Sequence, residues 1–252
     1  MNKYFLNKIQ YRIINGKSVH KNRYPHFASI CLKGNNIPFC GGSYIGRNIV
    51  ITAAHCLDEG LKSTDIVVQF KKNNIYNKGI QYNLKSFLIH PEYNPETLDN
   101  DIAVIFLMGN PTRKGIKKLH LPKIHQNWFY KINRKCVILG YGYTKNNGKQ
   151  SFKLQHALIK IMDKNGDLNF YEKKSITNNM FLAADFKNMD DPTDNKDACT
   201  GDSGGPLFTW INKKKYLIGI VSWGYGCGLD LYPGVYTKVN NYRRWIKQNT
   251  GV

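Results

Sequence analysis

The hexapeptide GDSGGP at residues 201–206 is the most informative segment of this 252-residue chain. Two earlier segments, TAAHC at residues 52–56 and NDIA at residues 100–103, supply a histidine and an aspartate. A serine hydroxyl is a weak nucleophile at neutral pH, so it needs a base that takes its proton and a third group that orients this base. The chain provides these groups in the order His55, Asp101, Ser203. The pattern indicates nucleophilic catalysis by a serine.

The order of these residues separates the chain from other serine hydrolases. The residues around Ser203 also match the pattern Gly-x-Ser-x-Gly of α/β-hydrolases, in which the serine precedes the acid and the histidine. Here the histidine and the aspartate come first, which excludes that order for the motifs present. Taken singly, the three residues could be an ordinary buried histidine, a loop aspartate and a turn serine. Their joint occurrence in three motifs favours the catalytic interpretation.

The three motifs resemble those of the chymotrypsin–trypsin family of serine proteases, and the resemblance covers residues 13 to about 248. It implies an all-β fold of two six-stranded antiparallel β-barrels, with the active site in the cleft between them, plus a C-terminal α-helix. It also implies a serine endopeptidase that works through an acyl-enzyme. In such an enzyme His55 is the general base and then the general acid, and Asp101 orients it. The backbone N–H groups of Gly201 and Ser203 would form the oxyanion hole.

The hydrophobic pattern agrees with a β-barrel fold. Short apolar runs between turn residues are typical of antiparallel barrels or sandwiches. These runs are Phe27–Leu32, Asn48–Thr52, Ile66–Phe70, Ile102–Leu107, Val137–Leu139, Leu217–Val221 and Val235–Val239. We expect the crossover between the barrels near Lys117–Asn127.

Toward the C-terminus the apolar spacing becomes helical. The stripe contains Val239, Tyr242, Trp245, Ile246 and Asn249, and Arg243, Arg244 and Lys247 lie outside it. This spacing predicts a C-terminal helix that packs on the second barrel through its aromatic stripe.

The resemblance also implies a substrate pocket. In this family the residue six before the nucleophile lies at the pocket floor, and here it is Asp197. A carboxylate in a narrow slot demands a cation, because an unpaired buried charge is costly. We therefore expect cleavage after Arg, which is preferred, or Lys. Alternatively, Asp197 is one more acid of the polar loop that begins at Asp185. The other expected pocket residues are Ala198 beside the floor, Ser222, Trp223 and Gly224 along the substrate backbone, and Gly234 opposite Gly224 as a wall.

The segment RIING that begins at Arg12 resembles the activation junction of the family. Cleavage after Arg12 would release the ammonium of Ile13, which in the family pairs with the aspartate before the nucleophile, here Asp202. That buried ion pair orders the oxyanion hole and the pocket. We therefore expect a zymogen, with residues 1–12 as the activation segment and residues 13–252 as the protease domain.

Six cysteines in such a protease imply disulfides and an oxidising compartment, so we expect a secreted protein. By family position, Cys40 pairs with Cys56 and Cys199 pairs with Cys227. Residues 1–12 contain no apolar run long enough for a signal peptide. The natural start is therefore expected upstream, unless this N-terminus is trimmed. No stretch of about 18 apolar residues indicates a membrane span.

The remaining cysteines depart from the family pattern. Cys136 occupies the position of a family half-cystine, but Thr209 replaces its partner. Cys31 has no family partner, so these two cysteines could pair, remain free or link to another chain. Leu168 and Leu182 take the place of a third family bridge.

The chain is strongly basic, with 37 Lys and Arg residues against 17 acidic ones and a net charge of +20. Such a balance attracts nucleic acids, heparin-like polymers or anionic surfaces. Lysines outnumber arginines by 30 to 7, and a compositional bias explains this equally well. No zinc-finger spacing or RNA-recognition motif is present, so no specific nucleic-acid partner is expected. The expected partners of this monomer are protein substrates with Arg or Lys before the cleaved bond, with protein protease inhibitors and a polyanion as further candidates.

The region Phe70–Gln81 corresponds to the calcium loop of trypsins but contains no acidic residue. Because a hard cation prefers carboxylate oxygens, we expect no calcium here, and no other metal or cofactor. Two functions then compete. The first is an active endopeptidase, and the alternative is a catalytically idle homologue that binds polyanions through its basic surface. The complete set of histidine, aspartate and serine favours the enzyme.

Overall fold

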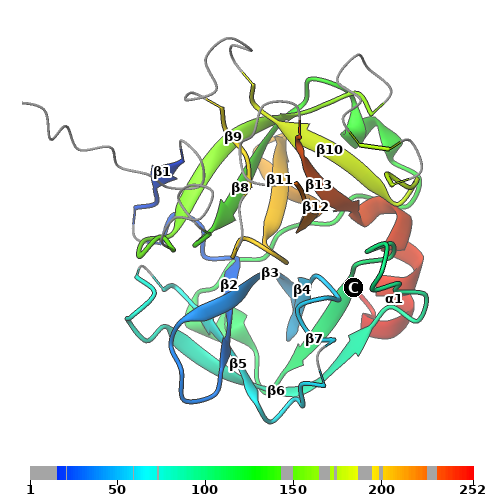
Figure 1. Cartoon of the computed structure of the whole chain (residues 1–252). Coiled ribbons are helices and arrows are strands. Elements are labelled where there is room, and N and C mark those ends of the chain that lie inside the picture. Colours follow the sequence, from blue (N-terminus) through cyan, green and yellow to red (C-terminus); the bar gives the residue numbers. More distant parts are fainter. Residues whose placement is uncertain are drawn as a thin grey trace, which may run out of the picture.

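The structure is a computed structural model (Figure 1). It describes residues 16–20, 22–58, 60–72, 74–142, 150–164, 171–172, 175–186, 195–198, 201–225 and 232–252. Two β-barrels lie one above the other in Figure 1, and the C-terminal helix lies along one side of the pair. No helix in these ranges is long and apolar enough to cross a membrane.

The first barrel is closed by six antiparallel strands in the order β2-β3-β4-β7-β6-β5. The strands are β2 Phe27–Leu32, β3 Pro38–Gly46, β4 Ile49–Thr52, β5 Ile66–Phe70, β6 Ile80–Ile89 and β7 Ala103–Leu107. Strands β4 and β5 are buried along their whole length, because they are apolar runs that face the barrel core or its covering segments. In strand β6 most of the solvent-exposed positions are polar and lie between apolar ones, as expected for a strand with one solvent-exposed face.

The second barrel is also closed and antiparallel. Its sheet has the order β1-β9-β10-β13-β12-β11-β8, and an additional pairing of β9 with β8 closes a ring of six strands with β1 attached at β9. The strands are β1 Lys17–Ser18, β8 Lys135–Gly140, β9 Gln155–Ile161, β10 Met180–Ala184, β11 Pro206–Ile211, β12 Lys214–Trp223 and β13 Gly234–Lys238. Two closed six-stranded barrels confirm the fold expected from the resemblance.

The crossover between β7 and β8 is hydrogen-bonded to both barrels. It contains two 3₁₀ turns, η1 Pro111–Lys114 and η2 Asn127–Tyr130. The Leu119 N–H donates to the Tyr44 carbonyl of β3 at 2.8 Å, and the His120 N–H donates to the Lys215 carbonyl of β12 at 2.9 Å. Two consecutive residues thus connect to different barrels, which limits how far the barrels can shift against each other.

The C-terminal helix is shorter than the sequence pattern predicts. The stripe begins with a 3₁₀ turn, η4 Val239–Tyr242, and only Arg243–Thr250 form the α-helix α1. Ile246 is fully buried, but Asn249 is exposed and does not belong to the packed face. Arg243 lies outside the apolar stripe, as expected, but it is half-buried and its Nε–H donates to the Pro122 carbonyl of the crossover at 2.7 Å.

Cys31 and Cys136 are free and buried, one in each barrel, so they do not pair with each other. Burial raises the pKa of Cys31 to about 11 and that of Cys136 to about 12, which keeps both thiols protonated. Thr209, which replaces the family partner of Cys136, donates its hydroxyl to the Lys135 carbonyl at 2.9 Å. Leu182 packs in a small apolar cluster with Tyr171, and Leu168 lies outside the described residues.

Candidate active site

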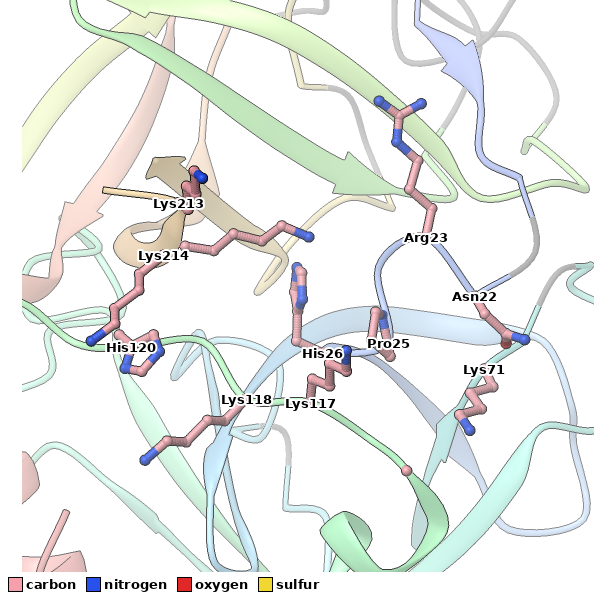
Figure 2. A pocket seen from close by; sticks show the side chains of 12 residues that line it. Asn22, Arg23, Pro25, His26, Lys71, Lys117, Lys118, His120, Lys213 and Lys214 are labelled. Atoms are coloured by element: carbon pink, nitrogen blue, oxygen red, sulfur yellow. The ribbon is translucent and has the colours of Figure 1, made fainter. Parts of the chain in front are cut away.

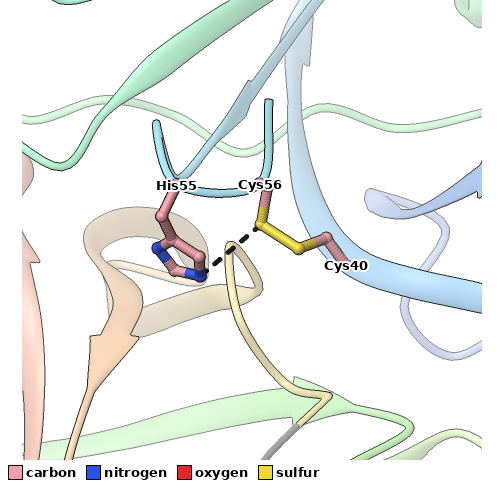
Figure 3. Close-up of side chains that lie close together, drawn as sticks. All are labelled: Cys40, His55 and Cys56. Atoms are coloured by element: carbon pink, nitrogen blue, oxygen red, sulfur yellow. Dashed lines mark hydrogen bonds between the residues drawn. A yellow bond between two sulfur atoms is a disulfide. The ribbon is translucent and has the colours of Figure 1, made fainter. Parts of the chain in front are cut away.

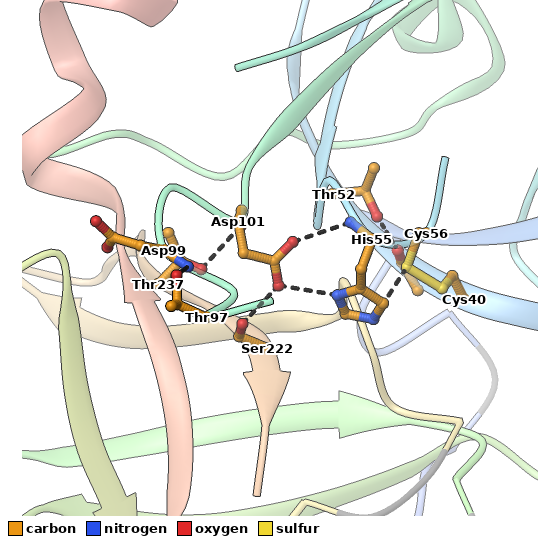
Figure 4. A network of polar contacts seen from close by, with 10 residues as sticks. Cys40, Thr52, His55, Cys56, Thr97, Asp99, Asp101, Ser222 and Thr237 are labelled. Carbon is orange, nitrogen blue, oxygen red and sulfur yellow. Dashed lines mark hydrogen bonds and ion pairs between the residues drawn. A yellow bond between two sulfur atoms is a disulfide. The ribbon is translucent and has the colours of Figure 1, made fainter. Parts of the chain in front are cut away.

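His55 and Asp101 meet at one end of the first barrel (Figure 4). His55 follows β4 and Asp101 precedes β7, and these strands pair with Thr52 opposite Ala103. The His55 Nδ1 lies 2.8 Å from Asp101 Oδ2, and the His55 backbone N–H donates to Asp101 Oδ1 at 3.0 Å. The carboxylate is fully buried, whereas a quarter of the imidazole side chain stays exposed (25%). The imidazole is therefore held on one side and accessible on the other.

The second barrel completes the surroundings of Asp101. The Ser222 hydroxyl of β12 donates to Asp101 Oδ2 at 2.5 Å, and the Thr237 hydroxyl of β13 donates to the Asp101 carbonyl at 2.8 Å. A buried carboxylate is costly unless such donors satisfy it. The sequence pointed to Ser222 only as a substrate-binding residue, and nothing in the sequence pointed to Thr237.

Ser203 lies on a tight turn between the barrels. Its carbonyl accepts the Gly41 N–H of β3 at 2.8 Å, while the Gly204 N–H donates to the Val221 carbonyl of β12 at 2.8 Å. Gly204 has a φ of +73°, and a Cβ atom there would lie 2.2 Å from Thr52 Oγ1. Only glycine fits this position. The turn therefore packs directly on the strand that leads to His55.

Asp202 is buried beside Ser203, in a space left by two glycines. Its Oδ1 accepts the Gly142 N–H at 2.8 Å. A Cβ atom on Gly140 would lie 1.7 Å from the same Oδ1, so no larger residue fits there without moving the carboxylate. The neighbouring Gly201 has a φ of +94°, which favours glycine. Arg12 and Ile13, the expected activation residues, lie outside the described residues.

Asp197 is buried, with 1% of its surface exposed, which distinguishes it from a solvated loop acid. Its Oδ1 accepts the N–H groups of Ala198 at 2.7 Å and Gly234 at 3.2 Å. A Cβ atom on Gly234 would lie 2.7 Å from this oxygen and 3.1 Å from the Tyr236 hydroxyl. Burial raises the pKa of Tyr236 well above its ordinary value, so the hydroxyl stays neutral. A residue larger than glycine at position 234 would therefore displace the carboxylate or the tyrosine ring.

Aromatic rings border the expected substrate segment. Tyr171 lies 5.1 Å from Trp223, 5.2 Å from Tyr225 and 5.6 Å from Tyr232, measured between ring centroids. Its hydroxyl donates to the Pro233 carbonyl at 2.9 Å, next to Gly234. This cluster packs around the segment that contains Gly234, the expected pocket wall. No motif surrounds Tyr171, so the sequence did not predict its role.

The disulfide Cys40–Cys56 is present, with a Cα–Cα distance of 6.2 Å. It joins β3 to the residue after His55, as Figure 3 shows. A crosslink of this kind contributes about 2–4 kcal/mol to stability. Cys40, His55 and Cys56 bring metal-ligand atoms together, but the sulfurs are bonded to each other and offer no thiolate to a metal. Cys199 and Cys227 lie outside the described residues.

The loop that corresponds to the calcium loop of trypsins contains a buried ammonium. Lys72 Nζ donates to the carbonyls of Asn36 at 2.5 Å and Asn77 at 2.7 Å, and to Gln69 Oε1 at 3.3 Å. Burial lowers the pKa of Lys72. The Lys72 carbonyl accepts the Tyr141 hydroxyl of the second barrel at 2.6 Å. The sequence shows Lys72 only as one lysine of a basic run, with no sign that it is buried.

Comparisons with known proteins agree with this geometry. The trypsin family model matches residues 13–246. The chain is 35% identical over 216 residues to a trypsin of Phaedon cochleariae, covering 85% of this chain and 80% of the relative. It is 37% identical over 218 residues to Trypsin Blo t 3 of Blomia tropicalis, covering 83% and 76%. It is 31% identical over 258 residues to the tissue-type plasminogen activator of Sus scrofa, where it covers 96% of this chain but only 45% of the relative.

The space around Asp202 generates a first prediction. Gly140→Ala places a methyl group against the Asp202 carboxylate, which must move together with the Ser203 turn. A displacement of about 1 Å can cost about 10²-fold in rate, so we expect at least that loss in kcat/KM on an ester substrate. The melting temperature is measured in parallel to show that the variant folds.

Gly34→Ala is the matched control. Nothing lies within 4 Å of a Cβ atom there, although its φ of +85° makes the change mildly destabilising. We expect less than a twofold change in kcat/KM. If a folded Gly140→Ala protein keeps full activity, Asp202 does not depend on this space.

Proposed function

Because the chain belongs to the trypsin family and is a serine endopeptidase, we propose that it cleaves peptide bonds after Arg, and less readily after Lys, through an acyl-enzyme intermediate. The observation that carries the assignment of the reacting groups is the His55–Asp101 hydrogen bond of 2.8 Å at the accessible edge of the first barrel. The Ser203 turn packs against that same edge through Gly204 and Thr52. The idle polyanion-binding homologue remains the alternative.

In the proposed mechanism Ser203 Oγ attacks the carbonyl carbon of the substrate while His55 takes the hydroxyl proton. The Asp101 carboxylate holds the imidazole in the tautomer with its proton on Nδ1 and stabilises the imidazolium. The N–H groups of Gly201 and Ser203 stabilise the oxyanion. His55 then protonates the leaving amine, and a water molecule hydrolyses the acyl-enzyme by the same steps. The buried, doubly hydrogen-bonded Asp101 supports this orienting role.

Labelling with diisopropyl fluorophosphate separates the enzyme from the idle homologue. After activation we expect stoichiometric modification of Ser203 and none in Ser203→Ala. Asp101→Asn should keep the fold but lower kcat by about 10⁴-fold, because the imidazole is then held in the wrong tautomer. An activated, folded protein that is not labelled would leave the binding function as the better explanation.

The proposed specificity rests on Asp197. Asp197 is a buried carboxylate packed against Gly234, and a cationic side chain would neutralise its charge. The guanidinium of Arg can pair with this carboxylate directly and through two hydrogen bonds. Lys is shorter and gains more from a neighbouring hydroxyl, but the neighbour here is Ala198.

We expect Arg to be preferred over Lys by about tenfold in kcat/KM, because one hydrogen bond to a charged group contributes about 1.5–3 kcal/mol and water replaces part of it. Matched peptides that differ only at the residue before the cleaved bond measure this ratio. Ala198→Ser should narrow the gap by improving Lys, and Asp197→Ser should abolish cleavage after both. Faster cleavage after Phe or Tyr would contradict the assignment of the pocket.

We also propose that the chain is a zymogen whose activation segment, residues 1–12, is removed by cleavage after Arg12. The space around Asp202 supports this, because a buried carboxylate next to the Ser203 turn is a suitable partner for a new Ile13 ammonium. We further propose that the protein is secreted, because disulfides such as Cys40–Cys56 form in oxidising compartments. Protein inhibitors would bind at the same site as substrates.

Self-activation follows, because Arg12 matches the proposed specificity. Incubation of the purified protein should give accelerating activity and a new N-terminus at Ile13, measured by N-terminal sequencing. Asp202→Asn should still be cleaved after Arg12 when active enzyme is added, yet remain weakly active. Ser203→Ala, incubated alone, should stay intact; its cleavage at an unchanged rate would point to another protease.

A further inference from the structure

A cavity lies at the seam, where segments of the two barrels and the crossover meet. None of its lining residues belongs to the candidate active site (Figure 2). Its volume is about 470 Å³, within the usual range for small-molecule sites. The lining comes from three separate regions and Lys71: residues 22–26 before β2, residues 115–120 of the crossover, and residues 213–215 at the start of β12.

The cavity is cationic. Seven of its lining side chains are Lys or Arg, and none is Asp or Glu. In the described part of the chain, no ion pair joins any of these seven to a carboxylate. Figure 2 shows Arg23, Lys117, Lys118 and Lys214 arranged around the space from different segments. Like charges repel one another, and a bound anion would relieve this repulsion.

Two histidines beside these cations have lowered pKa values, in part because of the nearby lysines. His120 lines the cavity, and burial together with Lys118 and Lys214 lowers its pKa. His26 forms part of the buried wall, and burial together with Lys215 lowers its pKa to about 3. The Nε2 of His26 is buried and has no hydrogen-bond partner among the described residues. Both imidazoles stay neutral at physiological pH, so the lysines and the arginine supply the charge.

We propose that this cavity binds a compact polyanion that carries several sulfate or phosphate groups on one or two sugar-sized rings. The volume accommodates such rings, and cationic residues from three segments line it. Lysines dominate the lining, and ammonium groups attract sulfate and phosphate as point charges without a fixed bidentate geometry. No Phe, Tyr or Trp lines the cavity to stack a base, which disfavours single-stranded nucleic acid.

The cavity lies where the barrels are joined. His120 donates to the Lys215 carbonyl, and the adjacent Leu119 donates to Tyr44 in the other barrel. A polyanion that contacts both Lys117 and Lys214 would therefore link the crossover to the second barrel. Because such a ligand binds only the folded chain, it should also raise the melting temperature.

The test uses the full chain with Ser203→Ala, which prevents autolysis, and isothermal titration calorimetry at about 0.15 M salt. A fully sulfated heparin disaccharide and inositol hexakisphosphate represent the sulfate and phosphate sources, and a short oligothymidylate represents nucleic acid. We expect binding of at least one of the first two, with a matching rise in melting temperature.

Two variants with equal loss of charge locate the site. Lys117→Ala/Lys118→Ala/Lys214→Ala removes three exposed cavity lysines and should weaken binding by about tenfold or more. Lys62→Ala/Lys85→Ala/Lys247→Ala removes three exposed lysines elsewhere and should change it less than twofold. Equal effects of both variants, or no binding of either ring compound, would overturn the proposal. Equally tight, cavity-dependent binding of oligothymidylate would replace it by a nucleic-acid site.

Discussion

The buried carboxylate of Asp101 is the contact on which the arrangement of this protein depends. Asp101 belongs to the first barrel, where it accepts two hydrogen bonds from His55, and the second barrel adds the hydroxyl of Ser222. Thr237 binds the carbonyl of the same residue. A buried charge tolerates little misplacement of its donors, because each unsatisfied position costs free energy. The requirement to satisfy one carboxylate therefore constrains how the two barrels lie against each other.

The sequence was sufficient where a residue belongs to a motif or to a continuous apolar run. The runs at Phe27–Leu32 and Ile66–Phe70 are strands β2 and β5 with the same bounds. Strand β9 was missed because its buried positions alternate with polar ones, and β3 because Gly41 and Gly42 interrupt its apolar pattern. These glycines serve the contact between the barrels: a Cβ atom on Gly41 would lie 2.8 Å from the Gly205 Cα.

Side chains whose partners are distant in the sequence were beyond sequence reasoning for a related reason. Thr237, Tyr171 and Lys72 have ordinary neighbours in the sequence, and each has a hydrogen-bond partner more than thirty residues away. Helical spacing does not reveal that the crossover contacts Arg243, which lies outside the apolar stripe of the helix. The seam contains both the Asp101 carboxylate, which accepts three hydrogen bonds, and a cluster of cations that form no ion pair with a described carboxylate.

Lys72 has a consequence beyond its own loop. Its ammonium binds oxygens of residues 36, 69 and 77, its carbonyl holds the Tyr141 hydroxyl, and the next residue, Gly142, binds Asp202 beside Ser203. An ammonium covalently tethered to the chain has no dissociation constant, so neither dilution nor a chelator removes it. The cation that organises this loop is therefore part of the polypeptide and not an ion bound from solution. Its contacts reach the Ser203 turn wherever the pH leaves the lysine charged.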